Sequence, residues 1–177
     1  MIDTERLLLR PIAPRDHAAL MAQSQDAETM RFLLPVPDQA AFDAMIERLT
    51  ASQATKGYAF WTIERRDDGA FLGLCGLKDG APDTPIADDV EIGWRLGRDY
   101  WGRGFAREAA SATLEWAWVN TAAPQIAAIT VPQNVASWGL MERLGMTRDL
   151  AGDFDHPLVP NDSLLRRHIT YSIARPA

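Results

Sequence analysis

The sequence is short of residues that support several well-known classes of protein. Its 177 residues include one cysteine, Cys75, and three histidines. A single cysteine cannot form an internal disulfide, which fits a reducing compartment and predicts a cytoplasmic location. No stretch reaches the ~18 consecutive apolar residues of a membrane span, and the charged N-terminal region does not resemble a signal peptide. We therefore expect no disulfide framework and no membrane segment, and we interpret Cys75 as a core residue.

Positive charge is also scarce. The chain has 24 acidic and 18 basic residues, a net charge of −6, and 47% hydrophobic residues. A nucleic-acid surface needs many lysines and arginines to displace counterions, so we expect no nucleic-acid partner. Length and composition are typical of one globular domain, residues 1–177.

The common nucleotide-binding motifs are missing as well. The stretch "YWGRGFAREA", residues 100–109, contains Gly102 and Gly104, but Arg107 stands where a dinucleotide fingerprint has its third glycine. No G-x-x-x-x-G-K-[ST] sequence is present, which argues against a Walker-type ATPase. The acidic residues near His156 are too irregularly spaced to predict a metal site.

The hydrophobic periodicity predicts a mixed α/β sheet covered by helices. An Asp-Gly turn at residues 68–69 favours an antiparallel hairpin, whereas the strand–helix–strand unit from Val90 to Val131 allows a parallel pair. Asn134 and Gly145 fit the N-cap and the C-terminal stop of one helix. We interpret residues 148–163 as a long loop. The expected strands are 6–12, 58–66, 70–77, 90–96, 125–131 and 165–173, and the expected helices begin near residues 14, 38, 105 and 134.

Two interpretations of the Gly-Arg-Gly stretch follow from its position between the strand ending at Leu96 and the next helix. A helix N-terminus has unpaired N–H groups and the positive end of a dipole, and glycines without Cβ let a diphosphate approach the backbone. Arg103 and Arg107 add positive charge, with Arg95 and Arg98 upstream. The alternative is a plain tight turn with solvated arginines, and spacing alone leaves both open.

A second motif favours the first interpretation. "NVASWGLMERLGM", from Asn134, together with "EIGWRLGRDYWGRGFAREA" and "TERLLLRPI", closely resembles the GNAT superfamily of acetyl-CoA-dependent N-acyltransferases, in particular its RimJ/RimL-like branch. The resemblance covers nearly the whole chain. It implies a mixed, mostly antiparallel sheet of about six to seven strands, with helices on both faces and a V-shaped splay between the central strands.

The same resemblance implies acetyl-CoA as co-substrate, an amine acceptor at a protein N-terminus or on a small molecule, and no metal. Backbone N–H groups would hold the CoA diphosphate, the pantetheine arm would pair with the backbone around Trp94, and Asn134 would bind the same arm. Trp101 replaces the usual Gln or Arg of the loop. The implied cofactor-binding residues are Trp94, Leu96, Trp101, Gly102, Arg103, Gly104, Phe105, Ala106, Arg107 and Asn134.

Two residues are candidates for catalysis. Glu91 lies on the strand beside the implied thioester and suits a general base acting through water; the alternative is a strand carboxylate paired with an arginine. Many superfamily members place a tyrosine acid seven residues after the motif asparagine, but here that position is Met141. Ser137 is the natural substitute as a donor to the departing sulfur, unless its hydroxyl only satisfies local backbone.

Other assignments stay open. Trp61, Trp94 and Trp138 either line the acceptor slot or pack in the core, and His156 either reaches the acceptor cleft or lies on a loop. His168 is interpreted as a core residue. The rival functions are the same transfer to an antibiotic, polyamine or amino acid, a catalytically idle acyl-CoA-binding sensor, and a nucleotide-binding module unrelated to CoA. A homodimer is also left open.

Overall fold

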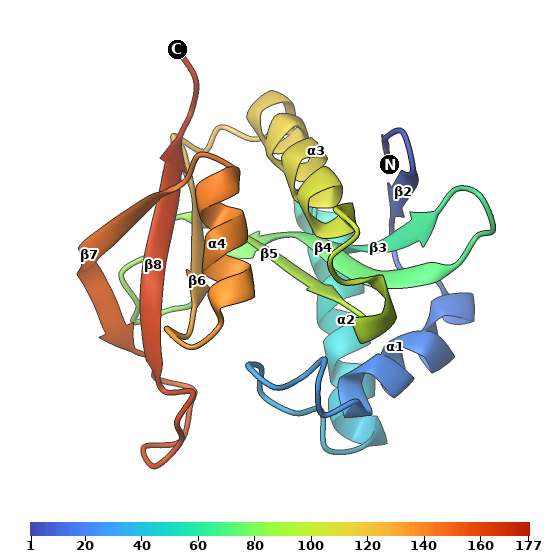
Figure 1. Ribbon diagram of the computed structural model, residues 1–177, viewed down its shortest axis with the longest axis horizontal. Coiled ribbons are helices and arrows are strands. Elements are labelled where there is room, and N and C mark those ends of the chain that lie inside the picture. Colours follow the sequence, from blue (N-terminus) through green and yellow to red (C-terminus); the bar gives the residue numbers. More distant parts are fainter.

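The computed structural model describes all 177 residues and contains one eight-stranded sheet (Figure 1). Its strands follow the spatial order β1-β2-β3-β4-β5-β6-β8-β7. The strands are β1 (Ile2–Asp3), β2 (Leu7–Arg10), β3 (Phe60–Arg65), β4 (Phe71–Asp79), β5 (Val90–Leu96), β6 (Gln125–Thr130), β7 (Thr147–Asp155) and β8 (Arg167–Ala174). The helices are α1 (His17–Gln25), α2 (Gln39–Lys56), α3 (Phe105–Asn120) and α4 (Val135–Arg143), with 3₁₀ turns η1 (Pro14–Asp16) and η2 (Arg98–Tyr100).

The mixed α/β architecture predicted from the sequence is confirmed. Every pair of neighbouring strands is antiparallel except β5 and β6, which the α3 crossover connects in parallel. The β3–β4 hairpin turns at Gly69 with φ of 70°, which a glycine adopts without strain. Asn134 caps α4, and Gly145, with φ of 82°, follows its end, as predicted.

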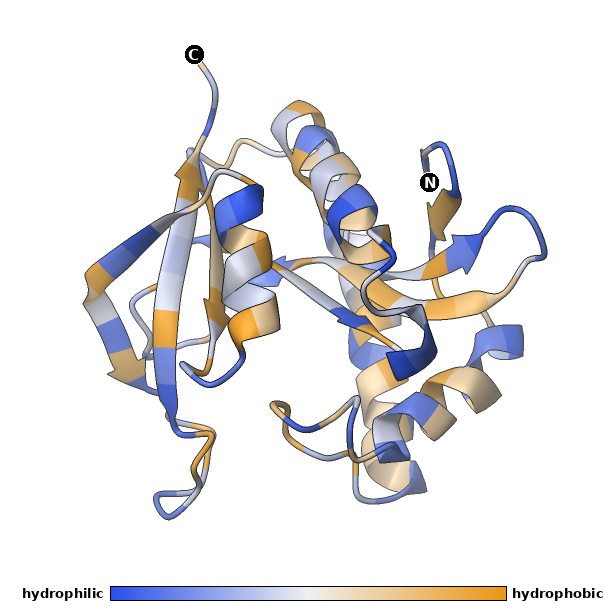
Figure 2. Ribbon diagram, viewed as in Figure 1, coloured by the Kyte–Doolittle hydropathy of each residue, from blue (hydrophilic) through white to orange (hydrophobic).

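The sheet has more strands than the six to seven expected, for two reasons. β1 has only two residues, and residues 147–155 form β7 where we predicted a loop. β7 is an edge strand with exposed polar residues, so its sequence lacks a continuous apolar face. Its pairing with β8 is also irregular between Asp149 and Phe154, where Gly152 O accepts a hydrogen bond from Thr170 Oγ1 at 2.6 Å. Figure 2 shows the contrast between β7, which alternates hydrophilic and hydrophobic residues, and the largely hydrophobic β4.

Helices cover both faces of the sheet. The larger core cluster joins α3 and α4 to β2–β6 and β8, and includes Ile92, Leu96, Ala109, Leu114 and Cys75, which is fully buried as expected. A smaller cluster on the opposite face joins α1 and α2 to β4 through Leu20, Phe42 and Leu74. No helix of the chain combines the length and apolarity needed to cross a bilayer.

The centre of the sheet splits where β5 meets β6. The two strands are paired only at Val90↔Ile126 and Glu91↔Ala127, near their starts. β5 continues to Leu96, paired only with β4 on its other side. The sheet therefore opens into the expected V, with Glu91 at its base and one edge of β5 free of a protein partner.

Candidate active site

Two helix N-termini meet the open end of this V. Because β5 and β6 run parallel, their carboxyl ends point the same way, and each strand is followed by a helix. α3 begins after β5 and the η2 turn, and α4 begins shortly after β6 (Figure 1). Parallel strands that separate and lead into helices create a crevice in which ligands commonly bind.

The junction before α3 presents a run of unpartnered backbone donors. The six N–H groups from Gly102 to Arg107 donate to no backbone or side-chain acceptor; bonding resumes at Glu108 N, which donates to Gly104 O at 3.1 Å. Residues 102–104 are exposed, whereas Phe105 is buried and Ala106 is half-buried, so the turn itself is the part of this run that is open to solvent. Arg103 and Arg107 are also exposed and form no ion pair. Free donors, the helix dipole and two uncompensated cations make this junction suited to a phosphate group.

The two glycines are required by their backbone conformation. Gly102 and Gly104 have φ of 69° and 80°, in the left-handed region that favours glycine. A Cβ at Gly104 would also lie 3.3 Å from Arg6 Nη2, while one at Gly102 would meet nothing within 4 Å. We call the turn that presents the N–H groups of residues 102–107 the cradle. It is narrow at Gly104, and a side chain there would occupy the space that an anion needs.

Arg6, at the N-terminal side of β2, holds the junction in place. Its Nε lies 2.6 Å from Glu108 Oε2, and its Nη1 donates to Arg103 O at 3.0 Å. The guanidinium also lies 4.6 Å from the centre of the Phe105 ring. Sequence reasoning assigned Arg6 no role, because its partners lie about a hundred positions further along the chain.

The free edge of β5 leads from the base of the V to this cradle. Trp101 is 49% exposed, and its Nε1 donates to Leu96 O at 2.8 Å. This bond ties the loop to the end of β5 and engages the Leu96 carbonyl within the protein. Trp94 is half-buried and packs against the core on the α3 side.

The start of α4 supplies the opposite wall. Asn134 Oδ1 accepts from Ser137 N at 3.3 Å, and Asn134 Nδ2 donates to Thr130 Oγ1 at 3.1 Å. The carboxamide is thus oriented by the protein and keeps one N–H free. Ser137 is half-buried, and its hydroxyl has no protein hydrogen-bond partner, so the alternative in which it satisfies local backbone is not realised.

Glu91 lies at the base of the V and is only 6% exposed. Its Oε2 lies 3.0 Å from Lys78 Nζ, across the β4–β5 pair, so its ionic partner is a lysine rather than the arginine considered above. Burial raises the pKa of Glu91, and Lys78 only partly opposes this shift. A carboxylate with a raised pKa beside an open crevice suits proton transfer.

A family model described as an acetyltransferase (GNAT) domain matches residues 6–147. The chain belongs to the GNAT acetyltransferase family. It is also 28% identical over 153 residues to the uncharacterised N-acetyltransferase YoaA of Bacillus subtilis, a match that covers 84% of each chain.

Solved structures share the whole fold of this acetyltransferase. A GNAT-family acetyltransferase from Bacillus anthracis has a TM-score of 0.79 and 22% identity, and the match covers 98% of each chain. A ribosomal-protein α-N-acetyltransferase, RimL, solved in complex with coenzyme A, has a TM-score of 0.77 and 16% identity over 97% of this chain and 95% of that one. At these identities, both comparisons support the fold rather than a shared acceptor.

Three side chains that we considered near the site lie instead in the core or on the α1 side of the sheet. Trp61 is 3% exposed and packs edge-on against Trp116, 4.9 Å between ring centres, so of its two alternatives the structure realises core packing. Met141 is also buried in the core. Arg95, counted with the basic residues of the loop, bonds instead to Ser24 and Met30, beneath the α1 side of the sheet.

A pair of histidines lies on the β7–β8 side. The rings of His156 and His168 are 5.0 Å apart, and Phe154 is within 6 Å of both. Burial lowers the pKa of each imidazole, and the charge of Lys78 lowers both further. Both histidines are therefore held neutral near the Lys78–Glu91 pair, although His168 is half-buried rather than a full core residue.

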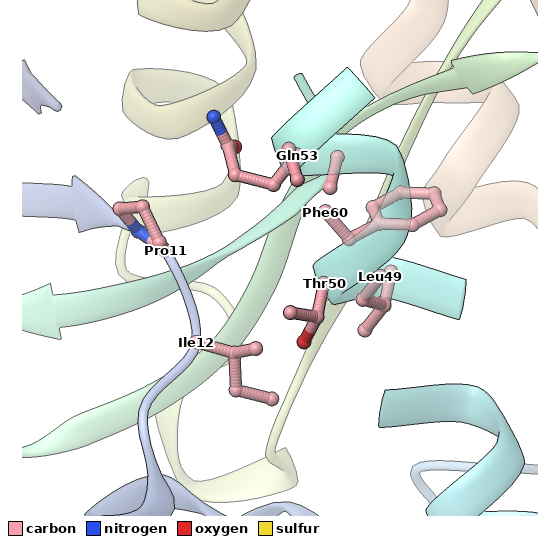
Figure 3. Close-up of a pocket in the computed structure, with 8 residues that line it drawn as sticks. Pro11, Ile12, Leu49, Thr50, Gln53 and Phe60 are labelled. Atoms are coloured by element: carbon pink, nitrogen blue, oxygen red, sulfur yellow. The ribbon is translucent and has the colours of Figure 1, made fainter. Parts of the chain in front are cut away.

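One cavity on the α1–α2 side carries no titratable group. About 200 Å³ of space lies between Pro11 and Ile12 on one side and Leu49, Thr50 and Gln53 of α2 on the other (Figure 3). Phe60 also lines it, and the same ring lies so close to β5 that a Cβ on Gly93 would be 2.9 Å from it. This cavity offers shape and apolar contact but no proton-transfer group.

Proposed function

We propose that this chain is an N-acetyltransferase that moves an acetyl group from acetyl-CoA to a primary amine by direct attack in a ternary complex. The observation that carries this proposal is the run of six unpartnered N–H groups, from Gly102 to Arg107, that follows the open edge of β5. The acceptor is a protein N-terminus or a small-molecule amine, and the RimJ/RimL-like branch is the proposed placement within the family. The cytoplasm is the proposed location.

The residues of the V would hold the co-substrate in order along the crevice. The N–H groups of Gly102–Arg107 would bind the diphosphate, helped by the charges of Arg103 and Arg107. Trp94 and the N–H of Leu96 would pair with the pantetheine arm in the manner of an added strand, and the free N–H of Asn134 would bind it from the other wall.

The transfer requires a neutral amine and a leaving thiolate. The amine nitrogen bonds to the thioester carbonyl carbon, the C–S bond breaks, and the amine loses a proton. Glu91 would take that proton through water, while the Ser137 hydroxyl would donate a hydrogen bond to the departing sulfur. An α-amino group, with a pKa of about 7.7–8.0, is roughly one tenth neutral at pH 7, so it needs far less help than lysine.

The decisive experiment measures CoA-thiol release from acetyl-CoA with a panel of amines and N-terminal peptides. The Gly104→Glu variant should lose CoA binding by at least about tenfold, because its side chain fills the cradle and its carboxylate repels the diphosphate. Gly57→Glu is the matched control, since Gly57 has φ of 78° and nothing within 4 Å of its Cβ position. Unchanged CoA affinity in Gly104→Glu would remove the cradle from the proposal.

Two further variants test the catalytic assignments. Glu91→Gln should lower turnover by roughly 10²–10⁴-fold where the wild-type carboxylate is ionised, and should remove the acid limb of the rate–pH profile. Ser137→Ala should lower turnover more than CoA affinity. A profile in Glu91→Gln that matches wild type at every pH would exclude Glu91 as the base.

A catalytically idle acyl-CoA-binding sensor is the second candidate. Met141 favours it, because a buried thioether occupies the position of the family's tyrosine acid and donates no proton. Tight CoA binding without thiol release on any amine of the panel would support the sensor and contradict the enzyme.

A further inference from the structure

β5 presents alternate residues to the side of the sheet opposite α3. Ile92 and Leu96 belong to the core under α3, so Glu91, Gly93 and Arg95 face α1 and α2. Two contacts agree with this assignment: the Phe60 ring lies over Gly93, and Arg95 bonds to Ser24 of α1. The strand therefore places the buried Glu91 carboxylate and the half-buried Arg95 guanidinium on one face, with the Phe60 ring over Gly93 between them.

Arg95 is a half-buried cation without an acidic partner. Its Nη2 donates to Ser24 Oγ and its Nη1 to Met30 Sδ, both at 3.2 Å, and its Nε is buried with no hydrogen-bond partner. Burial lowers the pKa of Arg95 to about 10, and no neighbouring acid opposes this shift. A hydroxyl and a thioether are weak compensation for a desolvated charge, so the guanidinium has unused capacity for an anion.

The same guanidinium forms part of a cavity of about 350 Å³. Residues 30 and 33–36 of the α1–α2 connection and Ala41 and Met45 of α2 provide apolar walls, and Arg48 adds a second guanidinium. No aspartate or glutamate lines it. Leu33 and Leu34 are 41% and 44% exposed, so the walls present apolar surface that the folded chain does not cover.

From this arrangement we propose that the cavity binds the acceptor, and that the acceptor is an amine with an aliphatic body and a carboxylate several bonds away, which pairs with Arg95. This inference rests on the proposed function, since it places the amine near Glu91 and the carboxylate further along the same face of β5.

The chemistry of the lining selects this class of acceptor. A planar guanidinium matches a carboxylate in a two-bond geometry, and one buried arginine neutralises one negative charge. Polyamines would bring further positive charge against Arg95 and Arg48, so the cavity disfavours them. The apolar walls suit methylene groups between the two ends of the acceptor.

The spacing of Glu91 and Arg95 along β5 sets the length of the acceptor. Along one face of a strand, residues two apart are separated by roughly 7 Å, so Arg95 and Glu91 lie roughly 13 Å apart at the backbone. The amino and carboxylate groups of a free α-amino acid share one carbon and do not reach both ends. A chain such as 6-aminohexanoate separates the groups enough to place its amine toward the V and its carboxylate at Arg95.

The test compares three acceptors of similar length: 6-aminohexanoate, 6-aminohexanamide and hexane-1,6-diamine. Wild type should prefer the carboxylate over the amide by roughly 10- to 100-fold in kcat/KM, and should use the diamine least. Arg95→Met should remove the preference by raising KM for 6-aminohexanoate, with KM for acetyl-CoA unchanged. Arg95→Lys should restore part of it, and Arg66→Met, which removes an exposed arginine elsewhere, should behave as wild type.

A binding measurement separates this inference from the proposed function. By calorimetry, N-acetyl-6-aminohexanoate should bind wild type at least about tenfold more tightly than its amide, and Arg95→Met should bind both equally. This binding result supports a carboxylate site at Arg95 even if no amine releases CoA. Absence of CoA release would contradict only the proposed acetyltransferase activity. Equal use and equal binding of carboxylate and amide by wild type would overturn the inference, as would an Arg95→Met variant that loses acetyl-CoA affinity but keeps the preference.

Discussion

Two arginines lie beneath opposite ends of α1, and their surroundings differ completely. Arg10 makes two parallel bonds to Asp16, at 2.7 and 2.8 Å, and two more to Glu64, at 2.8 and 2.7 Å. Arg95, beneath the last turn, has only a hydroxyl and a thioether. The hydrogen bonds that Arg10 donates to Asp16 raise the pKa of Arg10, whereas burial lowers that of Arg95.

The difference separates a charge that the protein itself compensates from one that it does not. Arg10 joins β2 to the start of α1 and to β3, and every partner it needs is in the protein. Burying a cation without an anion costs stability, and such arrangements are concentrated at functional sites. The same residue type therefore stabilises the fold at one end of α1 and weakens it at the other, where a ligand would complete it.

The largest effect is expected at the paired arginine. Arg10→Met should lower the free energy of unfolding by about 3–5 kcal/mol, because it leaves the Asp16 carboxylate buried without its cation. Denaturant titration measures this, with Arg66→Met as a surface control that should change stability by less than about 1 kcal/mol. If Arg10→Met also loses less than about 1 kcal/mol, the ion pairs of Arg10 do not stabilise the fold and the contrast with Arg95 is wrong.

The pH dependence sharpens the same test. Burial alone would raise the pKa of Asp16, but Arg10 and the Ala13 N–H outweigh it and lower the pKa. Asp16 therefore adds stability at neutral pH that is lost as the pH falls below about 4 through the lowered value. In Arg10→Met this acid-induced loss should shrink or reverse.

The unpaired arginine should show the opposite sign. Arg95→Met should raise the free energy of unfolding by up to about 3 kcal/mol at neutral pH, because a pKa lowered from 12.5 to about 10 marks a charge that disfavours folding. In the wild type the charged Arg95 lowers the free energy of unfolding by its full amount below about pH 10, and this destabilisation decreases as the pH rises above that value. Destabilisation of Arg95→Met by several kcal/mol would show that Arg95 is structural.

Glu91 is expected to give the smallest effect, because Lys78 partly compensates its burial. Its raised pKa means that the contribution of Glu91 to wild-type stability is most favourable below about pH 4.3 and declines as the pH rises through the folded-state value. Glu91→Gln should remove this slope and change stability at neutral pH by about 1 kcal/mol or less. A difference in stability between wild type and Glu91→Gln that moves in favour of wild type as the pH rises would contradict the raised pKa.

Local sequence patterns predicted most of the fold and the cradle. The Asp-Gly turn, the capped α4 and the glycines at positions 102 and 104 act through their own backbone conformation, so their signal is local. The sequence did not reveal β7, because an exposed edge strand needs no apolar pattern. It did not reveal the Lys78–Glu91 ion pair either, because that pair depends on the register between β4 and β5.

The sequence by itself determined most of the strands and helices and the Gly-Arg-Gly turn before α3, and its resemblance to a known family implied the V in the sheet. Only the tertiary structure decided which arginine has a partner. Arg10 and Arg95 both lie in strands, and no local pattern shows that Asp16 of η1 and Glu64 of β3 come within reach of Arg10 while no carboxylate pairs with Arg95. Charge compensation depends on distances between elements that are far apart along the chain, and those distances exist only once the sheet has formed.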